Sequence, residues 1–190
     1  MLLLVGLGNP GSNNVNNRHN IGFKIIDAVN AHFKLSKQKP KFKGLLTTGN
    51  IESKKIYAIK PLTFMNNSGT AIKELIDYFK IDAKNVFVFH DDMDIDFGKI
   101  KAKFGGSSAG HNGINSIDKF IGKDYSRIRI GIGHPKQKNK VNNHVLEDFK
   151  EDEEEKIKEI AESIVKLIPT LIEKKMDLFS SKVNQNLNGI

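Results

Sequence analysis

The stretch Leu2-Leu-Leu-Val-Gly-Leu-Gly-Asn-Pro-Gly11 decides the fold of this 190-residue chain. The apolar run Leu2–Val5 predicts a buried strand, and the Gly, Asn and Pro residues after it predict a turn. The triplet Arg18-His19-Asn20 follows, just before an apolar segment of helical period. Turns at strand ends are where α/β folds place their reactive groups. Amide groups and an imidazole at such a turn are suited to holding a carbonyl and activating water.

The same stretch fits the dinucleotide-binding pattern G-x-G-x-x-G through Gly6, Gly8 and Gly11. That pattern requires a helix that opens at the third glycine and faces the pyrophosphate. Gly11 instead leads into Ser-Asn-Asn-Val-Asn-Asn, which has no apolar helical face. The ribose-binding acid would fall near Asp27, inside a helical pattern. A tight turn that uses glycine for its backbone freedom is the better interpretation of the glycines, although it leaves the asparagines and the histidine unexplained.

Composition predicts one globular domain with a full hydrophobic core. The chain is 38% hydrophobic, and it contains no apolar run of transmembrane length. Leu2–Leu4 lacks the basic residues that precede a signal sequence. The absence of cysteine excludes a disulfide framework, a thiolate metal site and a cysteine nucleophile. We therefore expect a cytoplasmic protein.

Charge is unevenly distributed along the chain. The formal net charge is +8, but residues 147–159 hold eight acids against three lysines, a local charge of −5. The rest of the chain therefore carries +13. A separate basic surface is typical of proteins that bind polyanions such as nucleic acids. A solvated lysine-rich surface is the alternative explanation.

Hydrophobic periodicity alternates between strand and helix along the chain. It predicts strands at 2–7, 45–51, 55–60, 86–89, 99–104 and 128–132, and helices at 21–33, 72–79 and 114–121. A long helix starts near Asp152, and Pro169 is expected to end or kink it. Residues 34–43 are expected to be a polar linker. We predict a single three-layer α/β domain over residues 1–182, with a twisted mixed β-sheet flanked by helices, and a frayed tail at 183–190.

Residues 106–110 match G-x-S-x-G, the nucleophile elbow of serine hydrolases, with Ser108 as the nucleophile. That motif follows a buried central strand and works with a separate oxyanion loop. The preceding strand, 99–104, is too charged for a central parallel strand, and no glycine-rich oxyanion loop lies upstream. A flexible glycine/serine turn is the favoured interpretation, and a serine esterase remains the less favoured one.

Four asparagines fall where strands pass into loops: Asn9, Asn20, Asn66 and Asn112. One such asparagine is usually a turn former or a helix cap. Several that converge at strand ends indicate amide groups that bind a peptide-like or nucleotide ligand, or that polarise a carbonyl.

Three histidines compete for the role of general base: His19, His90 and His111. Asp91 is the attractive partner, because a carboxylate fixes the tautomer of an imidazole and raises its basicity. His90 adjoins Asp91 on a strand, so the two side chains should point to opposite faces. His19 and His111 therefore remain as candidates. No H-x₃-H or HExxH spacing indicates a metal site.

Several motifs together resemble the bacterial-type peptidyl-tRNA hydrolases. They are Gly6-Leu-Gly-Asn-Pro-Gly11, Arg18-His-Asn-Ile-Gly-Phe23, Lys60-Pro-Leu-Thr-Phe-Met-Asn-Asn-Ser-Gly69, His90-Asp91, Gly106-Ser-Ser-Ala-Gly-His-Asn-Gly113 and Arg127-Ile-Arg-Ile-Gly-Ile-Gly-His-Pro135. The resemblance runs in order from residue 2 to about 150. It implies hydrolysis of the ester between a peptide's C-terminus and the 3′-terminal ribose of tRNA, without a cofactor or a metal.

The resemblance also implies roles for individual residues. His19 would be the general base and Asp91 its orienting acid. The peptide and the terminal adenosine would be held by Asn9, Met65, Asn66, His111 and Asn112. Lys103 and Arg129 would grip the 5′-phosphate of the tRNA. We expect peptidyl-tRNA as the partner, no membrane association and a monomer; the oxyanion donor stays open between asparagine side chains and a backbone amide.

The chain departs from the family pattern at four positions near the site. Asn14 and Asn17 stand where the family usually has Tyr and Thr, and Ile114 and Asn115 stand where Leu and a basic residue are usual. These departures put the packing of the His19 loop and one phosphate contact in doubt. A catalytically silent RNA-binding protein on the same fold is the alternative from another functional class, but the intact site residues argue against it.

Overall fold

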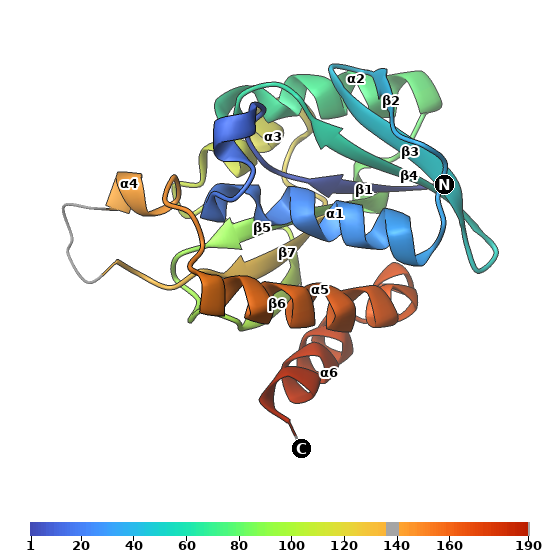
Figure 1. Cartoon of the computed structure of the whole chain (residues 1–190). Coiled ribbons are helices and arrows are strands. Elements are labelled where there is room, and N and C mark those ends of the chain that lie inside the picture. Colours follow the sequence, from blue (N-terminus) through green and yellow to red (C-terminus); the bar gives the residue numbers. More distant parts are fainter. Residues whose placement is uncertain (136–140, 190) are drawn as a thin grey trace.

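A computed structural model describes residues 1–135 and 141–189. Its centre is a seven-stranded sheet in the order β2-β3-β4-β1-β5-β7-β6 (Figure 1). The strands are β1 (Leu2–Gly6), β2 (Lys39–Lys41), β3 (Gly44–Ile51), β4 (Lys54–Pro61), β5 (Val86–Asp92), β6 (Ile100–Phe104) and β7 (Ser126–Gly131). The four central strands β4, β1, β5 and β7 run parallel, and the outer strands β2, β3 and β6 join the sheet through antiparallel pairs: β2 with β3, β3 with β4, and β6 with β7. The predicted mixed sheet is confirmed.

Helices cover both faces of the sheet (Figure 1). They are α1 (Ile21–His32), α2 (Ser68–Phe79), α3 (Asn112–Ile121), α4 (Val141–His144), α5 (Glu151–Ile172) and α6 (Met176–Asn188). Alternation along β1 separates two cores: Leu2 and Leu4 face α1, α5 and α6, whereas Leu3 and Val5 face α2 and α3. The predicted three-layer α/β architecture is therefore correct. None of the helices in the described part of the chain is long and apolar enough to cross a membrane.

Glycines let α1 press against the end of β1. A Cβ atom on Gly6 would lie 2.2 Å from the carbonyl oxygen of Gly22, and one on Gly22 would lie 2.4 Å from the backbone nitrogen of Leu7. A Cβ on Gly8 would meet the ring of Phe23 at 2.8 Å. The G-x-G spacing thus serves close packing rather than nucleotide binding, and it sets the short 3₁₀ turn Arg18–Asn20 at the carboxyl edge of the sheet.

One detail of the predicted elements is wrong, and another is narrowed to one of its two alternatives. Residues 34–43 are not only linker, because Lys39–Lys41 pair with β3 as an edge strand. An edge position tolerates Pro40, whose nitrogen donates no hydrogen bond. Of the two outcomes expected at Pro169, an end or a kink of the helix, the end is excluded, because α5 continues to Ile172. The last turn is held against the core by the buried side chains of Leu171 and Ile172.

The expectation of a frayed tail is wrong for residues 183–188, which complete α6, while Ile190 lies outside the described residues. This helix covers the free edge of β6 with polar side chains. Asn184 accepts from the backbone nitrogen of Ile100 at 2.8 Å and donates to its carbonyl oxygen at 2.9 Å. The Ser180 hydroxyl accepts from the backbone nitrogen of Ala102 at 2.8 Å. Side chains one helical turn apart thereby satisfy backbone groups that a further strand would bind.

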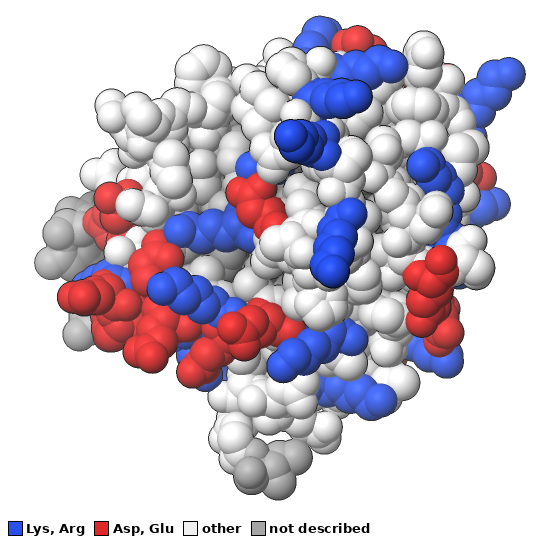
Figure 2. Space-filling view, turned by 45° about the vertical axis from the view of Figure 1, so that its right-hand side comes forward, with Lys and Arg blue, Asp and Glu red and all other residues white. Residues whose placement is uncertain are grey.

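The acidic segment around the start of α5 is partly neutralised. Glu153 pairs with Arg18 at 2.7 Å, and Glu154 pairs with Lys24 at 2.9 Å. Figure 2 shows a group of acidic side chains at the lower left of one face with basic side chains among them, while other Lys and Arg side chains are scattered over the rest of that face. Acids in a first helical turn also suit the helix dipole. The acidic segment therefore has a structural role at the start of α5. On the face shown in Figure 2, the distribution of charge does not by itself indicate a nucleic-acid-binding surface.

Candidate active site

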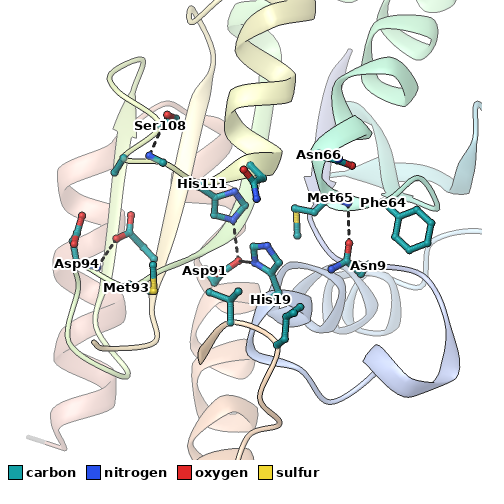
Figure 3. Close-up of a pocket in the computed structure, with 16 residues that line it drawn as sticks. Asn9, His19, Phe64, Met65, Asn66, Asp91, Met93, Asp94, Ser108 and His111 are labelled. Atoms are coloured by element: carbon teal, nitrogen blue, oxygen red, sulfur yellow. Dashed lines mark hydrogen bonds and ion pairs between the residues drawn. The ribbon is translucent and has the colours of Figure 1, made fainter. Parts of the chain in front are cut away.

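A cavity of about 610 Å³ opens at the carboxyl ends of the parallel strands (Figure 3). Its walls come from the turn after β1, the end of β5, the starts of α2 and α3, and the segment after α4. All of the predicted catalytic and substrate-binding residues line it: Asn9, His19, Met65, Asn66, Asp91, His111 and Asn112. Five loops that are distant in sequence thus bring one set of polar groups together.

Two histidines share one carboxylate oxygen at the floor of this cavity. Oδ1 of Asp91 lies 2.8 Å from Nδ1 of His19 and 2.9 Å from Nε2 of His111. The Asp91 side chain is 2% exposed and each imidazole 9%. Figure 3 shows both imidazoles converging on Asp91. The choice between the two histidines, open at the level of sequence, depends on what their other ring nitrogens do.

His111 has both ring nitrogens engaged. It is the N-cap of α3, and its Nδ1 accepts from the backbone nitrogens of Gly113 at 3.1 Å and Ile114 at 3.3 Å. A nitrogen that accepts carries no proton, so this network assigns the ring proton to Nε2, which donates to Asp91. Protonation of Nδ1 would place a cation against the positive end of α3. His111 therefore has no lone pair available for water.

His19 has the opposite tautomer. Its Nδ1 faces the Asp91 carboxylate and must carry the proton, which leaves Nε2 with a free lone pair. Among the described residues no side chain or backbone group hydrogen-bonds this Nε2, and the ring lines the cavity. Burial alone would lower the pKa of His19, but the charge of Asp91 and its hydrogen bond outweigh burial and raise the pKa above 6.5.

The carboxylate and the third histidine have strongly shifted pKa values. Burial opposes ionisation of Asp91, yet His19 and His111 hold its pKa well below the usual range. Burial lowers the pKa of His90 to about 3. His90 donates from Nδ1 to the backbone oxygen of Asp91 at 2.8 Å, and its ring packs edge-on against His111 with centroids 4.9 Å apart. His90 is thus an uncharged residue that packs behind the site and supports His111, which agrees with its exclusion as the base.

Asn9 is oriented by two neighbours, Met65 and Asn20, and Figure 3 shows its contact with Met65. Its Oδ1 accepts from the backbone nitrogen of Met65 at 2.8 Å. Asn20 clamps its backbone, accepting from the Asn9 nitrogen at 2.8 Å and donating to the Asn9 oxygen at 2.9 Å. Because Oδ1 is engaged, the Asn9 Nδ2 group is the part of the amide available to a ligand in the cavity. Sequence reasoning noted Asn20 among the strand-end asparagines but did not assign it to the site.

Three further predicted residues surround the ligand space. Met65 is buried and packs against Gly113, where an added Cβ would lie 2.5 Å from its Sδ. Asn66 is exposed in the 3₁₀ turn Met65–Asn67, and Asn112 is the exposed first residue of α3. The buried thioether forms a wall, while the two amides are free to bind an incoming ligand.

Several apolar residues line the cavity without any local sequence pattern that marks them. Phe64 and Leu146 line the cavity although their side chains are largely exposed, at 68% and 51%. Together with Met93 and Val145 they form the apolar part of the cavity wall. The carbonyl oxygen of Val145 also accepts from the backbone nitrogen of His19 at 2.8 Å. This segment lies more than a hundred residues from His19 in sequence, and no local pattern marks such a contact.

Ser108 lines the cavity but lacks the surroundings of a nucleophile. The described residues place no imidazole in hydrogen-bonding contact with its hydroxyl, which accepts from the backbone nitrogen of Gly110 at 3.3 Å. The strand before it, β6, is an antiparallel edge strand of the sheet. A nucleophile elbow requires a strand-to-helix turn at a central strand. The glycine/serine turn is the interpretation that the geometry supports.

Lys103 and Arg129 lie outside the cavity, on the neighbouring strands β6 and β7. Arg129 donates from Nε to Oδ2 of Asp92 at 2.6 Å, and Asp92 lines the cavity. Partial burial and the charges of Arg129 and Arg127 lower the pKa of Lys103. The structure therefore brings the two predicted phosphate-binding cations together beside the cavity rather than in it.

His19, Asp91 and His111 are residue types that can bind a metal, but their spacing is that of hydrogen bonds. Their facing atoms all lie within 4.8 Å of one another. Ligand atoms around one tetrahedral zinc ion would lie roughly 3.3 Å apart, given bonds of about 2.0 Å. Here Asp91 is only 2.8 and 2.9 Å from the two nitrogens, both of which carry a proton. The geometry is that of two hydrogen bonds to one carboxylate and does not fit a metal.

Comparison with known proteins agrees with this geometry. The sequence profile of the peptidyl-tRNA hydrolase family matches residues 3–189. A peptidyl-tRNA hydrolase of Pelagibacter ubique is 71% identical over 97% of this chain and 99% of its own length, and one of Bartonella henselae is 45% identical over 100% and 98%. The crystal structure of the Acinetobacter baumannii peptidyl-tRNA hydrolase superposes with a TM-score of 0.90 at 33% identity, covering 97% of this chain and 95% of that one. The chain belongs to the peptidyl-tRNA hydrolase family.

Proposed function

We propose that the chain hydrolyses the ester between a peptide's C-terminus and the 3′-terminal ribose of tRNA, with His19 as the general base. One observation carries the choice of base. His19 presents a free Nε2 to the cavity, whereas both nitrogens of His111 are engaged by Asp91 and by the start of α3. Positioned base catalysis contributes about 10²–10⁴-fold to such reactions.

The reaction proceeds by attack of water on the ester carbonyl. His19 Nε2 takes a proton from water as the water oxygen bonds to the carbonyl carbon, and the resulting imidazolium is stabilised by Asp91. Collapse of the tetrahedral intermediate breaks the bond to the ribose oxygen, which receives the proton from His19. The products are a tRNA with a free terminal hydroxyl and a peptide carboxylic acid, which releases the second proton of the water to solvent and becomes a carboxylate.

Asparagine side chains hold the substrate around this base. The Nδ2 of Asn9 is a donor for the carbonyl or oxyanion, because its amide is fixed by Met65 and Asn20. Asn66 and Asn112 bind the peptide and the terminal adenosine at the mouth of the cavity. Lys103 and Arg129 bind the 5′-phosphate of the tRNA as a clamp outside it.

We propose that the protein works as a cytoplasmic monomer on this substrate. The support for a monomer is that one chain supplies the base, its carboxylate, the asparagines and the cationic pair. Size-exclusion chromatography with light scattering tests this, and a dimer at assay concentrations would contradict it.

Single-turnover cleavage of an N-acetylated aminoacyl-tRNA tests the mechanism. His19→Ala should slow cleavage at least a hundredfold while binding stays within a few-fold. Ser108→Ala should retain activity and serves as the matched control for a serine esterase. A His111→Ala variant that is slower than His19→Ala would contradict the assignment of the base, and no cleavage by the wild type would favour a silent RNA-binding protein.

A further inference from the structure

Asp92 stands between the cavity and the cationic pair, and both of its carboxylate oxygens are engaged. Oδ2 accepts from Nε of Arg129 at 2.6 Å, and Oδ1 accepts from the backbone nitrogen of Asp94 at 2.9 Å. The residue is 8% exposed and closes the carboxyl end of β5. It therefore ties the β7 arginine to the loop that forms one wall of the cavity.

This contact fixes how Arg129 presents its guanidinium. With Nε bound to Asp92, the two terminal nitrogens remain for a ligand, and in the described part of the chain neither donates a hydrogen bond to protein. A planar fork with two free N–H-bearing ends matches a phosphate oxygen pair. The Arg129 side chain is 19% exposed, so the fork is held at the surface but is not mobile in solvent.

The positive charge of Lys103 repels Arg129, so a contact that holds the Arg129 side chain in place is needed to keep the two cations together. Lys103 lies two residues beyond Lys101, which pairs with Arg129 across the β6–β7 ladder, so like charges stand on the same face of the two strands. Partial burial, followed by the charges of Arg129 and Arg127, lowers the pKa of Lys103, and the charge of Asp92 opposes that shift. Without a carboxylate beside it, Arg129 would be free to swing away from Lys103.

We propose that Asp92 is a positioning residue that holds the Arg129 fork toward a terminal phosphate monoester, next to Lys103. This role depends on the phosphate clamp of the proposed function, and it adds the residue that orients it. The carboxylate works through Arg129 and does not itself touch the phosphate.

Charge and orientation make opposite predictions for an Asp92→Asn variant. If Asp92 only offsets positive charge, its neutralisation should strengthen the attraction for phosphate. If it positions Arg129, neutralisation should weaken phosphate binding, because an amide has one acceptor oxygen and cannot accept from both Arg129 and Asp94. The isosteric change must therefore break one of the two hydrogen bonds.

The test compares two substrates on each variant. The kcat/KM for a peptidyl-tRNA with a 5′-phosphate is divided by that for the same tRNA with a 5′-hydroxyl, so that general effects on chemistry cancel. We expect the wild-type ratio to be well above one and the Asp92→Asn ratio to fall at least about fivefold. The slope of log KM against log salt concentration for the phosphorylated substrate should also become smaller, by roughly the amount that one phosphate contact contributes.

Two matched variants isolate orientation from charge. Asp94→Asn removes the same charge from the same loop without contacting Arg129, and it should keep the wild-type ratio. Asp92→Glu keeps the charge but displaces the carboxylate, so its ratio should fall; it also serves if Asp92→Asn does not fold. In an Arg129→Ala background, Asp92→Asn should change the ratio no further.

The outcomes separate this role from the clamp itself. A wild-type ratio of one overturns the clamp and the role of Asp92 together, whereas His19-dependent hydrolysis would stand. A wild-type ratio above one that Asp92→Asn leaves unchanged or increases overturns the role of Asp92 alone.

Discussion

Replacing Asp91 by asparagine should both slow the enzyme and move its pH profile in a direction that the geometry specifies. The amide keeps an oxygen toward His19 and His111 but removes the negative charge. In the wild type that charge overcomes burial and raises the pKa of His19 above 6.5. With the charge gone, burial dominates and the pKa of His19 should fall below 6.5.

The expected loss of rate follows from the charge that His19 develops during catalysis. Two unit charges about 4 Å apart interact by about 4 kcal/mol at an effective dielectric constant of about 20. Since about 1.4 kcal/mol corresponds to a tenfold change in rate, we expect kcat to fall by about 10²- to 10³-fold. The variant should be slower even though more of its His19 is neutral at pH 7.

The assay is kcat/KM for an N-acetylated aminoacyl-tRNA between pH 5 and 9, which reports the pKa of the free enzyme's base. The wild-type acid limb should have its midpoint above pH 6.5, and the Asp91→Asn limb should lie below it. Asp94→Asn is the control, because it removes a cavity carboxylate that pairs with the exposed His134. An Asp91→Asn limb that stays in place, or moves up, would refute the reasoning.

Three other substitutions test the supports of the site and the sheet. Asn20→Ala should release the Asn9 turn and lower kcat/KM about tenfold or more, since small misplacements of binding groups are costly; an unchanged value would contradict the clamp on Asn9. His90→Asn should make the free energy of unfolding less sensitive to acid. The unfolded wild-type chain binds a proton at His90 below about pH 6.5, whereas the folded chain binds it only near pH 3. In urea titrations, the free energy of unfolding of the wild type should therefore fall by about 2 kcal/mol more than that of the variant between pH 7 and pH 5. Equal losses would show that His90 does not stay neutral. Asn184→Ala should lower the free energy of unfolding by about 1–2 kcal/mol, because Ile100 loses both of its edge hydrogen bonds; no change in urea titrations would mean that α6 does not protect the edge.

Much of the fold follows from local pattern. The apolar strand Leu2–Val5, its glycine turn and the helical period after it predict a buried parallel strand and a helix packed upon it. The predicted layers are confirmed because each core-facing element has a strong period of its own. The last helix, α6, escaped prediction because it binds the β6 edge partly through Asn184 and Ser180, and polar residues in a terminal segment are also typical of a solvated tail.

The residues of the candidate site could be predicted from the sequence, but the choice between His19 and His111 as the base could not be made from residue patterns alone. The sequence indicated Asp91 as the partner of either His19 or His111, and the structure places both imidazoles on it. Which imidazole is available to water depends on His111 capping α3, a contact made by backbone nitrogens two and three residues away. The same residue pattern would arise if the helix began one residue later, so the sequence left both histidines open.

The most direct test of the central claim is ¹⁵N NMR of the histidine side chains at neutral pH, assigned by single His→Asn variants. The tautomers decide which histidine can accept a proton from water. We expect His111 to carry a proton on Nε2 and to accept hydrogen bonds at Nδ1, and we expect the neutral form of His19 to carry its proton on Nδ1, with a pKa above 6.5. A His111 with a bare Nε2, or a neutral His19 protonated at Nε2, would contradict the assignment of His19 as the base.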